Sequence, residues 1–462
     1  MKIKKICAII SVLTIAAMLL NPISVSAAGN TFKEGDKIQF GSYLGEKLTW
    51  TVIDIDEAGN PLIFADNLIG SKAYDVPDFN KQFTYTWHSP TETATSKLYA
   101  RFEWGVSTLR DWLNSVESDA SKIKYTTEVN PYESSFDSGY IPGEGGFLSA
   151  KNFSTAEASL IKEVNNKSYL IQYEQNLKES GSRYIEIPQG TWDMYDAAKY
   201  FDNAYSRTVS DKVFLLSLSE YIKAYEVMGD RVGKTDLLPT VKNMLKDNYN
   251  FTSNMEAYLL RDNYMSDDNL IPYNMIMSTQ YIGDYRSIGG YTGAEGRSIE
   301  LKLYGVRPAC WIDSSKISSL GGLGITTYPY ILNGTPYQTI KGAVNINIDG
   351  YDVKFITESG VPFIDGASRT QVPLRVTLES YGATVSWNSS TKTAIVEKNG
   401  IKVEVPVGKN YIIVNGVQQT IDTAAQNVNG RIYLPIKSVV VALGGEVVWD
   451  SVTKTVLISK DK

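Results

Sequence analysis

Two stretches near the end of the chain share one pattern of apolar and polar positions. Residues 372–396 read VPLRVTLESYGATVSWNSSTKTAIV and residues 434–458 read LPIKSVVVALGGEVVWDSVTKTVLI, so the copies start 62 residues apart and contain no insertion. In the first copy Leu374, Leu378 and Tyr381 recur at the spacing of an apolar helix stripe, and alternating positions of a half-buried strand follow. Pro373 suits the first helical turn, and Gly382 suits the end of the helix. The pattern predicts a duplicated unit of strand, helix, strand, turn and strand.

The connections around these units also predict sheet structure. Asn-Gly and Asp-Gly pairs favour tight hairpins because type I′ turns need positive φ at both central residues. Residues 343–462 are therefore expected to form a mainly antiparallel sheet with two short helices packed on it. The pairs begin at Asp349, Asp365, Asn399, Asn415 and Asn429.

The repeated motif V-P-L-R, short helix, G-A-x-V-x-W-N/D, T-K-T resembles the copper amine oxidase N-terminal-like domain, an accessory module of secreted Gram-positive proteins. The resemblance covers about the last quarter of the chain. In that family copper is held by histidines of a separate catalytic domain. The only histidine of this chain, His88, lies outside the repeat. We therefore expect no copper and no other cofactor.

The larger part, residues 28–313, mixes strand and helix signals. Strands are expected at 38–41, 48–54, 61–64, 213–216, 258–262 and 304–312. Ser107 and the capping box from Ser154 to Glu157 predict helix starts, Ser217 or Ser219 precedes another helix, and 237–245 is a further candidate. Residues 74–101 read as an irregular loop, and Asp56 to Asn60 as a turn that lacks the ligand spacing of an EF-hand. The fold class is thus α+β.

The ordered anchors F-G-x-Y, W-x-V-I-D, S-T-L-R-x-W-L-N, D-K-V-F-L-L-S, L-L-R and G-V-R-P-A-x-W-I resemble an uncharacterised domain family of secreted bacterial proteins. The family often has Trp-Leu-Arg-Ser where this chain has Leu259-Leu260-Arg261-Asp262. More remotely, the closing G-V-R-P-A strand resembles the end of C-type-lectin-like and formylglycine-generating-enzyme folds. The enzyme of that group works through cysteines, which matches poorly with the single Cys310 of the mature chain.

The beginning of the chain predicts export. A basic start, an apolar run at 6–20 and the small residues Val25, Ser26 and Ala27 indicate a secretory signal peptide over residues 1–27, cleaved before Ala28. Removing its three lysines and no acid shifts the formal net charge from −6 to −9. Nucleic-acid phosphates require a basic face, so this class of partner is not expected. No later stretch has membrane length, and a single remaining cysteine allows no internal disulfide.

Catalytic motifs are weak. His88 follows Trp87 in a stretch without a nucleophile motif. Paired carboxylates remain an alternative, with candidates Glu103, Asp111, Asp262 and Asp267. The segment from Gly229 to Thr235, GDRVGKT, is one residue short of a phosphate loop and follows a helix, so nucleotide binding is not favoured.

The sequence therefore leaves three hypotheses open. The first is a cell-surface or extracellular protein that binds a glycan or cell-wall polymer, with the C-terminal unit as an accessory module and residues 314–342 as a linker. The others are a carboxylate-dependent hydrolase of polysaccharide or cell wall, and a structural spacer.

The 30 tyrosines suit stacking on a polar polymer or, equally, the filling of long loops. Arginines beside aromatic residues suit ligand contacts or structural ties. The candidate ligand-binding residues are Trp87, His88, Trp104, Tyr258, Arg261 and Arg307.

Overall fold

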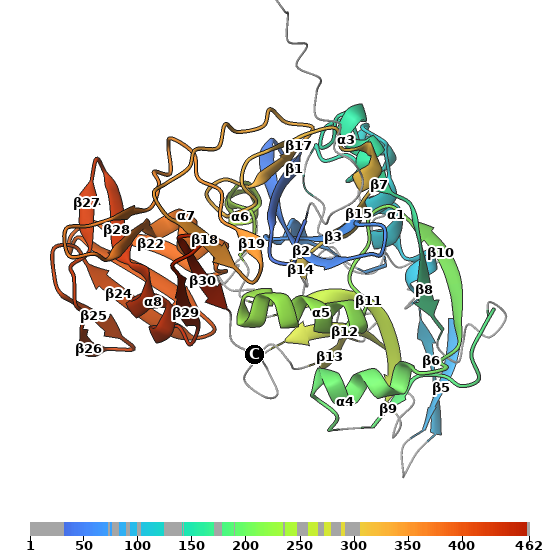
Figure 1. Ribbon diagram of the computed structural model, residues 1–462. Helices are drawn as coiled ribbons and strands as arrows, with labels where there is room; N and C mark the ends of the chain where they lie inside the picture. Colours follow the sequence, from blue (N-terminus) through green and yellow to red (C-terminus); the bar gives the residue numbers. More distant parts are fainter. Residues whose placement is uncertain are drawn as a thin grey trace, which may run out of the picture.

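The computed structural model describes most of the chain after the expected signal peptide, which lies outside the described residues. The described residues are 32–72, 74–75, 83–88, 93–98, 103–123, 141, 143–170, 178–188, 190–233, 236–246, 257–266, 272–278, 288–291 and 305–459. They form two hydrophobic cores. We call residues 32–313 the body, 314–342 the connecting segment and 343–459 the module (Figure 1).

The body is built on a seven-stranded sheet that begins as an antiparallel meander. Each of the first three strands pairs with its neighbour in sequence, and apolar side chains from them fill the body core. The turn from Asp56 to Asn60 is confirmed: Asp56 Oδ1 accepts the Asn60 amide at 2.8 Å. The strand order is β16 (Leu320–Gly321), β17 (Tyr330–Leu332), β1 (Lys37–Tyr43), β2 (Glu46–Ile55), β3 (Pro61–Ala65), β15 (Ala309–Ile312) and β7 (Ile161–Lys162).

A second sheet, one hairpin and a separate two-stranded sheet complete the strands of the body. The hairpin of β5 (Phe83–His88) and β6 (Thr93–Leu98) corrects the expectation of an irregular loop. Threonine and aromatic residues alternate in the sequence FTYTWH, and this β-favouring pattern was the missed signal. The second sheet has β13 (Ile288–Tyr291), β12 (Pro272–Ser278), β11 (Ala257–Ser266), β14 (Gly305–Val306) and β4 (Gly70–Ser71), with β9 (Glu186–Ile187) on β11; a separate two-stranded antiparallel sheet joins β8 (Val164–Tyr169) to β10 (Ser206–Asp211).

The helices α1, α3 and α5 of the body begin where capping side chains were expected, whereas α4, which begins after Asp193, was not predicted. The Ser107 hydroxyl accepts the Arg110 amide, and Ser154 and Ser217 form complete capping boxes with Glu157 and Glu220. The helices are α1 (Thr108–Asn114), α3 (Thr155–Leu160), α4 (Met194–Ala198), α5 (Leu218–Met228) and α6 (Pro239–Lys246); the 3₁₀ turns are η1 (Trp104–Val106), η2 (Ala120–Lys122), η4 (Lys199–Phe201), η5 (Gly229–Val232) and η6 (Ser314–Lys316).

The expected strand at 213–216 is wrong except for one bridge, between Phe214 and Ala309. These residues are buried, but side chains take over part of the backbone pairing. Asn114 Oδ1 accepts the amides of Lys212 and Val213, and Arg261 donates to the Leu215 carbonyl. These side chains come from α1 and β11, far along the chain, so the sequence around 213–216 gave no sign that they would replace a strand partner.

The module contains the duplicated unit, and its two copies have matching structures. The first consists of β21 (Thr370–Pro373), α7 (Leu374–Ser380), β22 (Thr384–Asn388) and β23 (Thr393–Lys398). The second consists of β28 (Arg431–Pro435), α8 (Ile436–Ala442), β29 (Glu446–Asp450) and β30 (Thr455–Ser459). β21 pairs with β28 antiparallel, so the copies share one sheet. Gly382 and Gly444 both follow the helices at φ 89°.

The strands of the module form three sheets, and one pairing is parallel. Each copy sends its last two strands to a different sheet, and β18 runs parallel to β30. The expectation of one mainly antiparallel sheet is therefore refined, because the duplicated unit divides its strands. The remaining strands are β18 (Asn345–Ile348), β19 (Tyr351–Asp352), β20 (Phe363–Ile364), β24 (Ile401–Pro406), β25 (Tyr411–Val414), β26 (Val417–Thr420) and β27 (Gln426–Val428).

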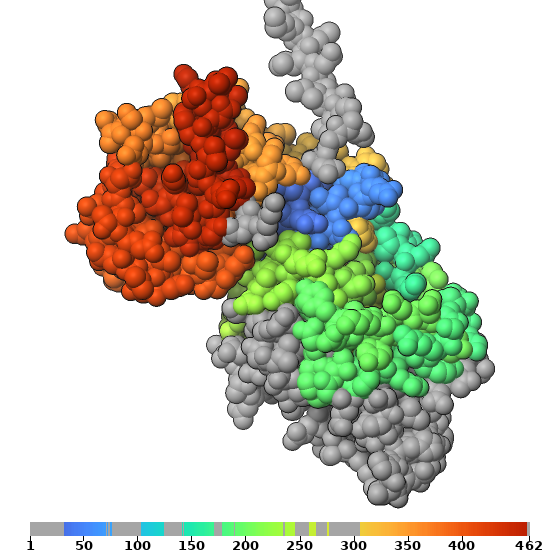
Figure 2. Space-filling model, turned by 60° about the horizontal axis from the view of Figure 1, so that its bottom comes forward, coloured from blue at the N-terminus to red at the C-terminus, as the bar shows by residue number. Residues whose placement is uncertain are grey.

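The connecting segment is structured, although the sequence predicts a linker. Its strand β17 lies parallel to β1, and Tyr330 joins the core of the body. Its Ile325 joins the core of the module, and Thr327 donates to both carboxylate oxygens of Glu379 at 2.9 and 2.8 Å. The segment is thus packed against both parts. Figure 2 shows the body (blue to green) and the module (orange to red) as two lobes in contact.

Candidate functional site

Two of the expected ligand-binding aromatics belong to the core of the body. Trp104 is 0% exposed, and its indole N–H donates to Asp211 Oδ2 at 2.9 Å. Tyr258 is 3% exposed, and its hydroxyl donates to the Val232 carbonyl at 3.1 Å. Buried polar groups with internal partners stabilise the fold, so these rings offer no surface to a ligand. Trp87 and His88 lie in β5, and their side chains are outside the described residues.

The two candidate arginines also tie buried segments together. Arg261 is 6% exposed and pairs with Glu220 at 2.5 Å on the helix start of α5. Arg307 is 1% exposed, donates to the carbonyls of Ala65 and Val232, and lies 4.0 Å from the Phe64 ring centroid. The sequence left open whether these arginines contact a ligand or tie segments of the fold together. Their burial among carbonyls and rings supports the second role.

The candidate carboxylates do not form a described catalytic pair. Glu103 is 0% exposed and forms a two-pronged ion pair with Arg207, at 2.8 and 2.6 Å. Asp262 is buried on β11, and Asp111 lies on the surface of α1 with 68% of its side chain exposed. Asp267 is outside the described residues. Among those described, no three His, Cys, Asp or Glu side chains gather as metal ligands.

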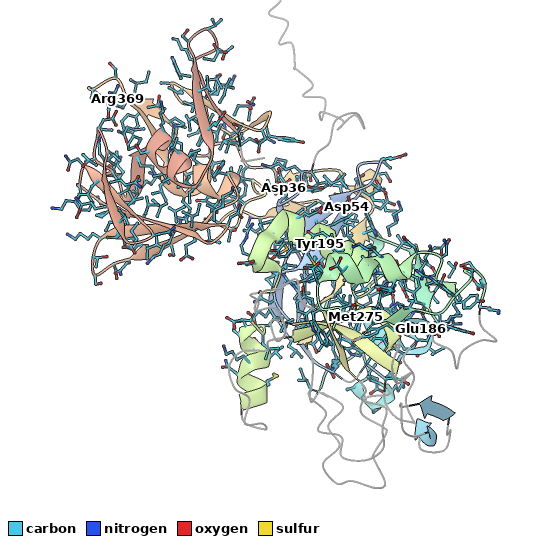
Figure 3. All side chains as sticks on the ribbon, turned by 90° about the horizontal axis from the view of Figure 1, so that it is seen from below. Asp36, Asp54, Glu186, Tyr195, Met275 and Arg369 are labelled. Atoms are coloured by element: carbon cyan, nitrogen blue, oxygen red, sulfur yellow. The ribbon has the colours of Figure 1, made fainter. Side chains whose placement is uncertain are left out.

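A large cleft lies between the body and the module, and the sequence did not predict it. Its volume is about 1270 Å³, and both lobes line it. The body contributes the start of β1, the end of α5 and the first three residues of η5, while the module contributes the β18–β19 turn, the end of α7 and the end of β23. In Figure 3 the labelled Asp36, just before β1, lies on the side of the body that faces the module.

Positive side chains surround one carboxylate on the body side of this cleft. Lys37 Nζ donates to both oxygens of Asp66 at 2.9 Å and to Thr51 Oγ1 at 2.7 Å. Arg231 and Arg307 line the same wall. Burial lowers the pKa of Lys37, and the two arginines add to this, while Asp66 opposes it. Burial alone would raise the pKa of Asp66, but Lys37 and the Thr51 hydroxyl hold it below its usual value.

Tyrosines line both walls of the cleft. Tyr195 on α4 and Tyr351 on β19 are 40% and 43% exposed, and Tyr225 on α5 is half-buried. Lys33 of the body lies 5.4 Å from the ring centroid of Tyr351 of the module, so the walls approach each other at this point. The cleft thus offers aromatic faces, hydroxyls and charges together. Figure 3 labels Tyr195.

Two sequence signals pointed toward the cleft without defining it. The tyrosine content was noted, and the GDRVGKT segment was singled out for its resemblance to a phosphate loop. The structure shows that Gly229–Val232 is a 3₁₀ turn at the end of α5 and that Arg231 lines the cleft. Lys234 and Thr235 lie outside the described residues. The meeting of distant segments could not be predicted from either signal alone.

Comparison with known proteins confirms both resemblances. The domain of unknown function DUF6273 matches residues 62–314, which is more than half of the chain, so the chain belongs to this family. The copper amine oxidase N-terminal domain matches residues 347–458. A Brevibacillus choshinensis protein named protease inhibitor is 31% identical over 104 residues, covering 22% of this chain and 31% of that protein. This chain therefore spans under a third of that relative. In the described part, no helix is long and apolar enough to cross a membrane.

Proposed function

We propose that this protein is exported and binds a polysaccharide, of the cell wall or the surroundings, in the cleft between body and module. The supporting observation is a cleft of about 1270 Å³ that has partly exposed tyrosines on both walls. A tyrosine ring gives a sugar an apolar face, and its hydroxyl adds a hydrogen bond. The proposal also includes a C-type-lectin-like fold for the body and an accessory role for the module.

The proposal predicts that the cleft tyrosines carry binding. Retention of the full chain on purified cell walls and on a glycan array would be measured for the wild type, Tyr195→Ala and Tyr351→Ala. We expect each substitution to weaken retention by about fivefold, as loss of a stacking contact worth about 1 kcal/mol implies. The matched control is Tyr337→Ala, because Tyr337 is 40% exposed and does not line the cleft. Equal retention of all four proteins would contradict the proposal.

A carboxylate-dependent hydrolase has less support. Glu103 is engaged by Arg207, and Asp262 accepts the Leu218 amide at 2.7 Å. Exposed acids such as Glu226 and Asp236 do line the cleft. Incubation of the protein with the polysaccharide that it retains, followed by analysis of chain length, tests this alternative directly.

Protease inhibition is a second alternative, raised by the name of the Brevibacillus relative. The shared 104 residues cover only part of either chain. An inhibition assay against a panel of secreted serine, cysteine and metalloproteases would test it, with a matched concentration of albumin as the control. Stoichiometric inhibition of any one protease would favour this alternative over polysaccharide binding.

A further inference from the structure

The ionisable side chains of the cleft are sorted by burial. The cations Lys37 and Arg231 are half-buried and Arg307 is buried, so the deep part of the body wall is positive. Asp66 is the carboxylate among them, and it is already paired with Lys37 and Thr51. Three cations against one anion leave a local excess of positive charge. In contrast, the lining acids of the body other than Asp66 are all exposed at the surface.

Arg231 is the cation best placed to receive a ligand. Its side chain makes one hydrogen bond to the described residues, from Nε to the Met228 carbonyl at 3.1 Å. That bond orients the guanidinium group and leaves both terminal nitrogens without a described hydrogen-bond partner in the cleft. Two parallel N–H groups on a planar fork match the two oxygens of a carboxylate or phosphate.

Burial strengthens such a contact. Attraction between charges grows as the surrounding dielectric falls, and salt screens partly buried charges less than exposed ones. Salt therefore screens the attraction of an anion to Arg231 less than its repulsion by the exposed acids of the lining. Burial also lowers the pKa of Arg231, although the group stays charged at neutral pH. A bound anion would offset this cost of burying the guanidinium group.

We infer that the cleft selects an anionic polysaccharide and that the guanidinium group of Arg231 binds its carboxylate or phosphate group, while Lys37 and Arg307, which already have internal partners, add positive potential to the same wall. This inference rests on the proposed function and narrows it to a substrate class. It also gives the GDRVGKT segment a role, since η5 holds Arg231 at the wall of the cleft. The two possible sources of the anion, a uronic-acid polymer and a phosphate-bearing polymer, share this chemistry and are separated by experiment.

Binding of the full chain to two matched pairs of polymers tests the inference. The pairs are polygalacturonate with its methyl ester, and dextran phosphate with dextran. We expect the wild type to bind one anionic polymer at least tenfold more tightly than its neutral counterpart, and to lose this preference as sodium chloride rises. Preference for polygalacturonate identifies a carboxylate as the group bound, and preference for dextran phosphate identifies a phosphate.

Arg231→Gln should weaken binding of the preferred anionic polymer by about tenfold, and Arg231→Lys should fall between it and the wild type. The matched control is Arg183→Gln, because Arg183 also donates only to backbone carbonyls, those of Lys199, Tyr200 and Asp202, and is not part of the cleft lining. Thermal melting checks that each variant is folded. If Arg231→Gln does not fold, the salt dependence and Arg231→Lys decide the question.

The outcomes separate the two proposals. Undiminished binding of the anionic polymer by Arg231→Gln, or equal binding of charged and neutral polymers, overturns the inference. If neutral polymers are then retained and lost with Tyr195→Ala, polysaccharide binding stands without anion selection. If the wild type binds no polymer, cell wall or glycan, both proposals fall.

Discussion

Asp262 illustrates how one residue can be misread from its chemical type. It lies on β11, where Oδ2 accepts the Leu218 amide in the first turn of α5, and Oδ1 has no described hydrogen-bond partner. The Oδ2 atom thus supports the start of the helix, and Asp262 is not among the residues that line the cleft between body and module. Burial raises the pKa of Asp262 to about 6, against the opposing effects of Arg261 and the Leu218 amide. A shifted pKa here reports a structural position.

The raised pKa predicts a pH-dependent cost to stability. Between about pH 4 and 6 the folded state binds more protons at Asp262 than the unfolded state, so the free energy of unfolding should fall as pH rises through this window. Asp262→Asn keeps an acceptor for the Leu218 amide and removes the titration. We expect the wild type to lose roughly 2 kcal/mol relative to this variant between pH 4 and 7. Urea unfolding at several pH values measures the difference, and parallel pH profiles would contradict it.

The role of a residue could be predicted from the sequence where its partners lie a few positions away. The caps Ser107, Ser154 and Ser217 and the helix-ending Gly382 and Gly444 depend on neighbours a few positions away. All were recognised from the sequence except that Ser219 stayed an alternative to Ser217. The roles of Trp104, Tyr258, Arg261 and Arg307 depend on residues far along the chain. Arg307, for example, donates to the carbonyl of Ala65. Residue type alone could not distinguish such ties from ligand contacts.

At the scale of secondary-structure elements, a buried ion pair between Lys72 and Glu144 holds the loop before α3 in place. Lys72 Nζ donates to Glu144 Oε1 at 2.6 Å, both side chains are 0% exposed, and Tyr43 donates to the other oxygen at 2.6 Å. The Lys72 ammonium also lies 4.4 Å from the Trp112 ring centroid. The pair therefore connects the strand β1, the helix α1 and a loop that lacks regular structure.

Lys72→Met should be strongly destabilising. It leaves the Glu144 carboxylate buried without its counter-ion, a change that typically costs about 3–5 kcal/mol. The control is Lys199→Met, because Lys199 pairs with Asp196 at the same distance of 2.6 Å but with both side chains mostly exposed. Chemical denaturation should show a large fall in midpoint for the first variant and none for the second. Similar midpoints would mean that the Lys72 pair contributes little.

The duplicated unit repeats an exposed tryptophan. Trp387 on β22 and Trp449 on β29 occupy equivalent positions of the two copies and are 42% and 46% exposed. Both strands lie at the edge of their sheets, so each indole has strand neighbours on one side only. The sequence correctly predicted the strands but suggested more burial for the tryptophans, because alternation does not distinguish edge strands from central ones.

If the module attaches the protein to cell walls, these tryptophans should contribute. Trp387→Ala and Trp449→Ala are each expected to reduce retention on purified cell walls several-fold, and the double variant further, while the melting temperature changes little. The control is Val417→Ala, since Val417 is 65% exposed on the edge strand β26. Full retention of the double variant would exclude the two indoles from attachment.

At the scale of the whole molecule, the cleft exists because two cores are held at a fixed distance. The repeat and the body anchors allowed both parts to be predicted separately, but the connecting segment, rich in Ser, Gly, Thr and Tyr, was interpreted as an interdomain linker. The structure instead inserts β17 beside β1 and Ile325 into the core of the module. Long-range pairing of this kind leaves no periodic trace in the segment itself.

Glu379 on α7 is the side chain through which this arrangement can be tested. Its carboxylate accepts the Thr327 amide and hydroxyl, and it is 9% exposed. Glu379→Ala removes both bonds and leaves the Thr327 groups to water, which should loosen the connecting segment from the module without unfolding either core. Limited proteolysis with mass mapping should then show faster cleavage within residues 314–342. Because the segment fixes the spacing of the walls, binding to cell walls should weaken in parallel.

Glu397→Ala, on the exposed part of β23, is the control for a charge removed from the module surface. Unchanged proteolysis of Glu379→Ala would show that strand pairing with β1 alone holds the segment. The contacts of the segment with the body would then determine the width of the cleft.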